Sequence, residues 1–115
     1  MKVYLAKDIK DLPAYGDIPD LTQGDESTID FFVITAEEVD VIDELFIDQT
    51  NELCDATLDR GDYQYYNADQ CGLMLDWIDK VIDTERYSEI NIFLSKLKLY
   101  LQYAEINNTG IAIEL

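Results

Sequence analysis

The most apolar stretch of the chain, residues 67–83, is interrupted by acidic or small residues at spacings of three and four, which is typical of an α-helix. Its remaining positions are apolar nearly all the way round. We therefore expect other elements to pack on most sides of this helix and Trp77 to be mostly buried. Asn67 is a suitable N-cap, and Gln70 can complete a capping box. This helix is predicted to lie at the centre of the core.

Two other stretches have helical spacing. The first begins after Thr35, where Glu38 completes a capping box, and is expected to run to about Leu58 with a weak point at residues 50–51. Its predicted buried face consists of Val39, Ile42, Leu45, Phe46, Gln49 and Leu53. The second runs from about residue 88 to residue 106. It is stopped by residues 107–110, which tolerate a positive φ.

Strand patterns occur near both ends of the chain. Residues 2–6 and 111–115 alternate between two faces, and residues 29–34 are apolar enough to predict an inner strand. Residues 63–66 form either a third short strand or an extended lead into the central helix. Between the first two strands, residues 8–28 lack periodicity. They predict a long loop held on the core by Leu12, Tyr15, Ile18 and Leu21.

These elements follow the order β-β-α-(β)-α-α-β, with the strand at residues 63–66 in doubt. The order predicts an α+β fold in which three helices pack on one face of a small three- to four-stranded sheet. Length predicts a single globular domain over residues 1–115, with residues 8–28 as its long tethered loop.

The charge of the chain narrows its possible partners. Twenty-five acids and eight bases give a formal net charge of −17, and residues 11–79 hold nineteen acids and one base, Arg60. Such a field disfavours binding to nucleic acid or to an anionic membrane, and it favours a basic protein as partner. The alternative is that the charge only keeps a small protein soluble.

Candidate chemistry is sparse. The chain has no histidine, and no motif of a nucleotide-binding, hydrolase or metalloprotease site appears. Cys54 and Cys71 fall on apolar helix faces and are expected to be buried and reduced. The acid-rich turn at residues 55–62 lacks the spacing of a calcium loop. We therefore predict no enzyme activity, no cofactor and no metal site. The N-terminus resembles neither a signal peptide nor a membrane span, so we expect a cytoplasmic protein.

The candidate binding site is a line of carboxylates at helical spacing on the helix that follows Thr35. We call it the acidic ridge and define it as Glu37, Asp40, Glu44, Asp48 and Asp55. No basic residue offsets it within the helix. Tyr63 and Tyr66 follow closely and add large contact area with a polar tip, so we predict them as further partner contacts. The alternative is an acidic face that only contacts solvent.

In size, charge and simple architecture the chain resembles the small acidic immunity proteins of bacteria, although no motif carries the resemblance. It implies a non-enzymatic inhibitor that blocks a basic toxin such as a nuclease domain, whose basic groove accepts carboxylates in place of phosphates. A second hypothesis is a phage-type inhibitor that mimics nucleic acid. A third is a carboxylate enzyme that uses a divalent metal.

Overall fold

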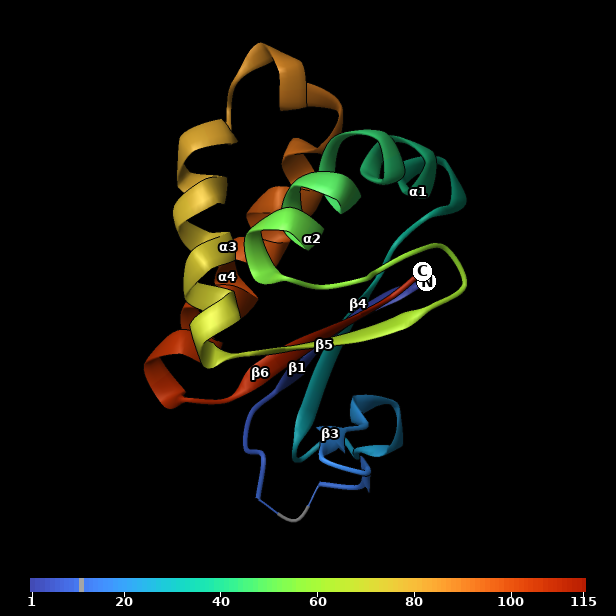
Figure 1. Cartoon of the computed structure of the whole chain (residues 1–115), viewed down its shortest axis with the longest axis vertical. Helices are drawn as coiled ribbons and strands as arrows, with labels where there is room; N and C mark the ends of the chain where they lie inside the picture. The colour runs from blue at the N-terminus through green and yellow to red at the C-terminus, as the bar shows by residue number, and fades with distance from the viewer. Residues whose placement is uncertain (11) are drawn as a thin grey trace.

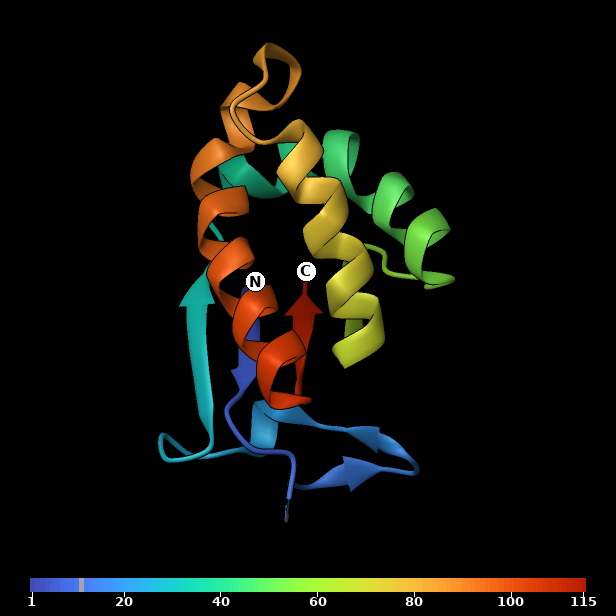
Figure 2. The same ribbon diagram turned by 90° about the vertical axis from the view of Figure 1, so that its left-hand side faces the viewer.

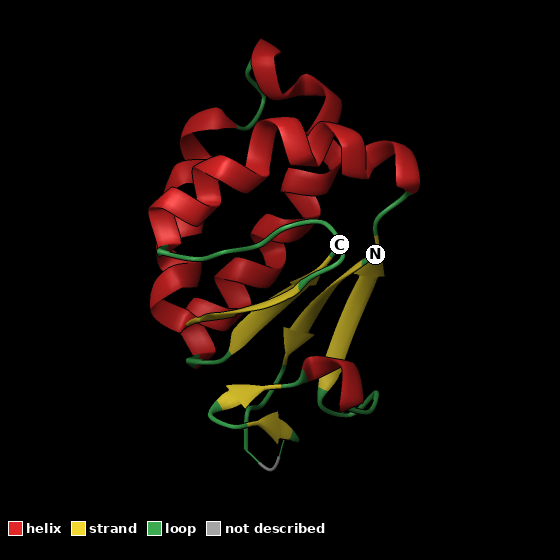
Figure 3. Ribbon diagram, turned by 45° about the vertical axis from the view of Figure 1, so that its right-hand side comes forward, coloured by secondary structure: helices red, strands yellow, loops and turns green. Residues whose placement is uncertain are grey.

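The computed structural model describes residues 1–10 and 12–115 and has two layers. A four-stranded sheet forms one layer, and all neighbouring strands in it are antiparallel. Helices cover one face of this sheet, and residues 12–28 lie on the other (Figures 1 and 3). The strands lie in the order β4 (Ile29–Val33), β1 (Lys2–Ala6), β6 (Gly110–Glu114) and β5 (Tyr63–Asn67). The predicted α+β fold is confirmed, and residues 63–67 are a strand.

The helical layer contains three continuous helical segments. The first comprises α1 (Ala36–Ile42), a π-helical turn (Asp43–Ile47) and α2 (Asp48–Cys54). The others are α3 (Ala68–Val81) and α4 (Asn91–Asn107), joined through a 3-10 turn at Glu85–Ile90. Both predicted capping boxes are present, Thr35 with Glu38 and Asn67 with Gln70. Of the described residues, none belongs to a helix long and apolar enough to cross a membrane.

The π turn changes which side of the first helix is buried. It inserts about one extra residue, so positions beyond it are rotated relative to a straight α-helix. Thr50 and Cys54 are buried where Gln49 and Leu53 were predicted. The Thr50 hydroxyl donates to the carbonyl oxygens of Phe46 and Ile47, which satisfies it inside the core. The helix ends at Cys54, earlier than the predicted Leu58, and its irregularity lies at the π turn and not at residues 50–51.

Strand β4 was predicted to be an inner strand, and this is wrong: it forms one edge of the sheet, as Figure 2 shows. Its Phe32 faces the helices and packs on Phe93 and Tyr100, with ring centroids 6.2 and 5.2 Å away. Phe31 points to the other face and is 53% exposed, with the Lys2 ammonium 4.5 Å from its ring centroid. Strand β4 therefore packs Phe32 against α4 and leaves Phe31 and Val33 exposed.

Each face of the sheet has its own core. Val3, Leu5, Ile111 and Ile113 face the helices, as their alternation predicts. The opposite face carries a smaller cluster of Tyr4, Ala6, Leu21, Ile29 and Ala112. Leu21, in the 3-10 turn Leu21–Gln23, packs in this cluster, and the partly buried Leu12 packs against it.

Helix α3 is less enclosed than its composition predicts. Helix α4 packs along one side and α2 along another (Figure 2), and its fully buried residues are Cys71, Met74 and Ile78. Leu73 is exposed and Trp77 is half-buried, so the expectation of a mostly buried Trp77 is only partly correct. Trp77 still contacts the core edge-to-face, with ring centroids 6.0 Å from Phe46 and 5.6 Å from Tyr87.

Candidate functional site

All five carboxylates of the acidic ridge are exposed, namely Glu37, Asp40, Glu44, Asp48 and Asp55. They do not form one straight line. The π turn rotates Asp48 relative to the residues of α1, and Asp55 lies beyond the last helical residue in a left-handed conformation with φ of 51°. The ridge is therefore a broad acidic surface along α1 and α2.

Arg60 offsets part of this charge from outside the helix. Its guanidinium lies 2.7 Å from an Asp40 carboxylate oxygen and 2.8 Å from one of Asp43. Both pairs are substantially exposed, so solvent screens them and they add little to stability. Arg60 fixes the loop at residues 59–62 against α1 and leaves Glu44, Asp48 and Asp55 without a basic partner among the described residues.

The prediction that Tyr66 contacts a partner is wrong, because its side chain is 0% exposed. Alternation along β5 turns Tyr66 toward the helices, while Tyr63 and Tyr65 face the other side of the sheet. Burial raises the pKa of Tyr66, and the Thr50 hydroxyl beside it acts in the opposite direction. Within the described part of the chain, the Tyr66 hydroxyl has no hydrogen-bond partner of good geometry.

Replacing Tyr66 with phenylalanine is expected to stabilise the fold. A buried hydroxyl without a partner costs about 1–3 kcal/mol, and phenylalanine removes it while keeping the ring. Urea unfolding should show an increase in the free energy of unfolding of that order, and Tyr66→Ala should show a large decrease. A loss of stability in Tyr66→Phe would mean that the hydroxyl is satisfied in solution.

Tyr63 was predicted to contact a partner, but its polar tip is used inside the protein. Its hydroxyl donates to the Pro19 carbonyl at 2.7 Å and accepts from the Leu21 backbone N–H at 2.9 Å. These two bonds hold residues 19–21 against the sheet. What remains available for contact is the side of the ring, which is half-buried.

Alkaline pH is expected to unfold the protein through its buried tyrosines. Burial is the main cause that raises the pKa of Tyr4 and of Tyr63 from 10.0 to about 12, and it raises that of Tyr66 as well. The native state then holds these protons more tightly than the unfolded state. Stability should be intact below pH 10 and fall as pH rises toward 12, by up to about 1.4 kcal/mol per pH unit for a fully buried tyrosine.

Urea unfolding at a series of alkaline pH values, followed by tyrosinate absorbance, measures this dependence. Tyr63→Phe should reduce its slope, since one of the protected hydroxyls is gone. A free energy of unfolding that stays constant between pH 10 and pH 12 would contradict the raised pKa values of these tyrosines.

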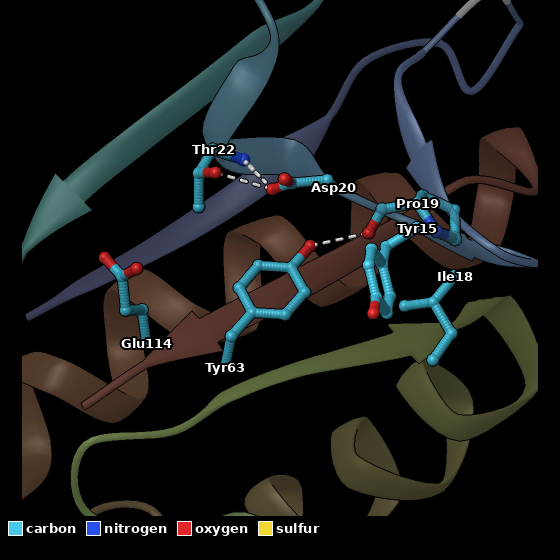
Figure 4. A pocket seen from close by; sticks show the side chains of 7 residues that line it. All are labelled: Tyr15, Ile18, Pro19, Asp20, Thr22, Tyr63 and Glu114. Carbon is cyan, nitrogen blue, oxygen red and sulfur yellow. Dashed lines mark hydrogen bonds between the residues drawn. The ribbon is translucent and has the colours of Figure 1, made fainter.

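A cavity of about 400 Å³ lies where residues 14–19 meet the sheet, and we call it the hairpin pocket. The hairpin consists of β2 (Ala14–Tyr15) and β3 (Ile18–Pro19), which pair antiparallel. Figure 4 shows Tyr63 rising from β5 into the pocket, with Tyr15 on one side and Glu114 on the other. The lining residues are Tyr15, Ile18, Pro19, Asp20, Thr22, Tyr63 and Glu114.

This pocket was not predicted from the sequence. Tyr15 and Ile18 were expected to hold the loop on the core, yet Tyr15 is 87% and Ile18 53% exposed. A signal was present in residues 13–20, where Gly16 stands between two apolar pairs and adopts a φ of 64°, as a tight hairpin turn requires. Glu114 joins the pocket from the far end of the chain, which local spacing does not reveal.

The remaining reactive groups are poorly placed for chemistry. Burial raises the pKa of Cys54 to about 11 and that of Cys71 to about 12, which keeps both thiols protonated at neutral pH. Over residues 1–10 and 12–115, no three potential metal ligands gather in one place. Compared with known proteins, the chain matches no protein-family model, no curated protein and no solved structure, so its candidate site is defined by its own geometry and charge.

Proposed function

We propose that this protein is a non-enzymatic binding protein that inhibits a basic protein partner, and specifically a cytoplasmic bacterial immunity protein that blocks a toxin. The observation that carries the proposal is the exposed acidic surface along α1 and α2, in a chain of net charge −17. Charge of this density accelerates encounter with a basic surface.

The distribution of charge favours a specific inhibitor over a mimic of nucleic acid. A mimic needs a regular row of negative charge that many nucleic-acid-binding proteins can read. Here Arg60 interrupts the row by pairing with Asp40 and Asp43. A surface that combines neutralised carboxylates at one end with free ones at the other is better suited to one complementary partner.

The test is capture of partners from the native host with the purified protein as bait, followed by identification by mass spectrometry. The proposal predicts a basic toxin domain, often a nuclease, encoded beside this gene. The captured protein, purified alone, should lose its activity when one equivalent of this protein is added.

A matched bait with Glu44→Gln, Asp48→Asn and Asp55→Asn should capture less of the same protein at low salt. Capture of many DNA-binding proteins that duplex DNA displaces would support the nucleic-acid mimic instead. A basic partner whose activity is unaffected by equimolar protein would refute the inhibitor function.

A further inference from the structure

Two carboxylates in the hairpin pocket are not neutralised. Asp20 and Glu114 line the pocket, and neither pairs with a basic side chain in the described part of the chain. The basic side chains that form ion pairs in the described part of the chain pair with other acids, and they are Lys7, Arg60 and Lys98. The pocket therefore offers concentrated negative charge in a partly enclosed space.

Its polar groups are held in place by bonds within the chain. Glu114 accepts a hydrogen bond from the Tyr4 hydroxyl at 3.0 Å, and Asp20 Oδ1 accepts from both the Thr22 N–H, at 3.1 Å, and the Thr22 hydroxyl. A carboxylate offers about four acceptor positions, so both retain capacity for an external donor. Because the groups are already oriented, a ligand would lose little free energy in arranging them.

The apolar part of the pocket suits a flat cation. Tyr15 and Ile18 remain exposed at the hairpin, and the Tyr63 ring stands between Tyr15 and Glu114 (Figure 4). A guanidinium stacks on aromatic rings and pairs with carboxylates through two parallel donors. An ammonium is more strongly hydrated and lacks the flat face, so it gains less from such a pocket.

We propose that the hairpin pocket receives an arginine side chain of a protein partner, with its guanidinium against the Tyr15 and Tyr63 rings and its charge facing Asp20 and Glu114. This rests on the proposed function, because the basic partner supplies the arginine. The hairpin that borders the pocket and the helices α1 and α2 that carry the acidic ridge lie on opposite sides of the sheet (Figures 1 and 3), so the two surfaces can be tested separately.

The test uses N-acetyl-arginine methylamide as the probe and N-acetyl-lysine methylamide as its matched comparison. Both are titrated into the isotopically labelled full chain and followed by NMR. Saturable shifts are expected at the Tyr15 ring and the Ile18 methyl groups, with a dissociation constant on the order of millimolar. The arginine compound should bind several-fold more tightly than the lysine compound.

Variants separate the pocket from general charge attraction. Tyr15→Ala and Glu114→Gln should each weaken arginine binding by roughly fivefold or more, because one removes a ring and the other a charge. Glutamine can still accept from Tyr4, so the fold is preserved. Asp76→Asn removes an exposed charge from α3, outside the pocket, and should bind as wild type.

Equal affinity for the two compounds, or unchanged affinity in both Tyr15→Ala and Glu114→Gln, would overturn the proposal. So would shifts spread equally over the acidic ridge. These results are independent of the capture experiment, which tests whether a basic partner exists at all. If arginine binds at the pocket but no basic partner is captured, the inhibitor function is refuted and the arginine site is still supported.

Discussion

Replacing Phe46 with alanine is expected to lower the free energy of unfolding by about 3–5 kcal/mol, a large part of what a small domain has. Phe46 is fully buried in the π turn. Its ring meets Phe93 and Trp77 edge-to-face, with centroids 5.3 and 6.0 Å away, and so joins three helical segments. Alanine would leave a cavity where these segments meet.

The change in the free energy of unfolding is measured by chemical unfolding followed by far-ultraviolet circular dichroism. Ile92→Ala is the control, because this side chain on α4 is 71% exposed and its loss should change stability by less than about 0.5 kcal/mol. A Phe46→Ala loss below about 1 kcal/mol would show that the π turn does not hold Phe46 in the core.

Removing three charges from the acidic ridge is expected to slow association with a basic partner by roughly ten- to a hundredfold at low salt, with little change in the dissociation rate. The variant is Glu44→Gln, Asp48→Asn and Asp55→Asn. Asp40 is left intact because its loss would release Arg60. Asparagine suits the left-handed conformation of Asp55.

Because like charges repel at helical spacing, this variant should fold at least as well as the wild type. The dependence of its association rate on salt should also flatten. A control with Asp76→Asn, Glu85→Gln and Glu89→Gln removes the same charge from other exposed positions and should slow association less. Equal slowing in the two variants would mean that net charge, and not the ridge, steers the partner.

Local signals in the sequence were reliable. The capping boxes at Thr35 and Asn67 formed as predicted, because a cap needs only residues three positions apart. Strands β1 and β6 place their apolar residues on the predicted faces, since alternation is a property of the strand itself. The buried line of α4 also follows its spacing, from Phe93 to Ala104.

Predictions of burial and strand position failed where a local irregularity of a helix, or the position of a strand in the sheet, changed which residues are covered. The π turn shifted the buried line from Gln49 to Thr50, because a single inserted residue rotates everything after it. The apolar strand β4 lies at an edge, since composition reports how apolar a strand is and not which neighbours it has. Tyr66 is in the core because the pairing of β5 with β6 decided which face it meets.

The sequence by itself determined the helical segments, strands β1, β4 and β6, the caps, the α+β class and the strong acidic charge, all of which depend on composition or on residues a few positions apart. Only the tertiary structure decided the candidate sites. Arg60 donates to Asp40, which lies 20 positions away in the sequence. Tyr63 donates to the Pro19 carbonyl, 44 positions away, and Tyr4 donates to Glu114, 110 positions away. Such contacts depend on how strands and helices pack, and the periodicity of a sequence does not predict which distant residues come into contact.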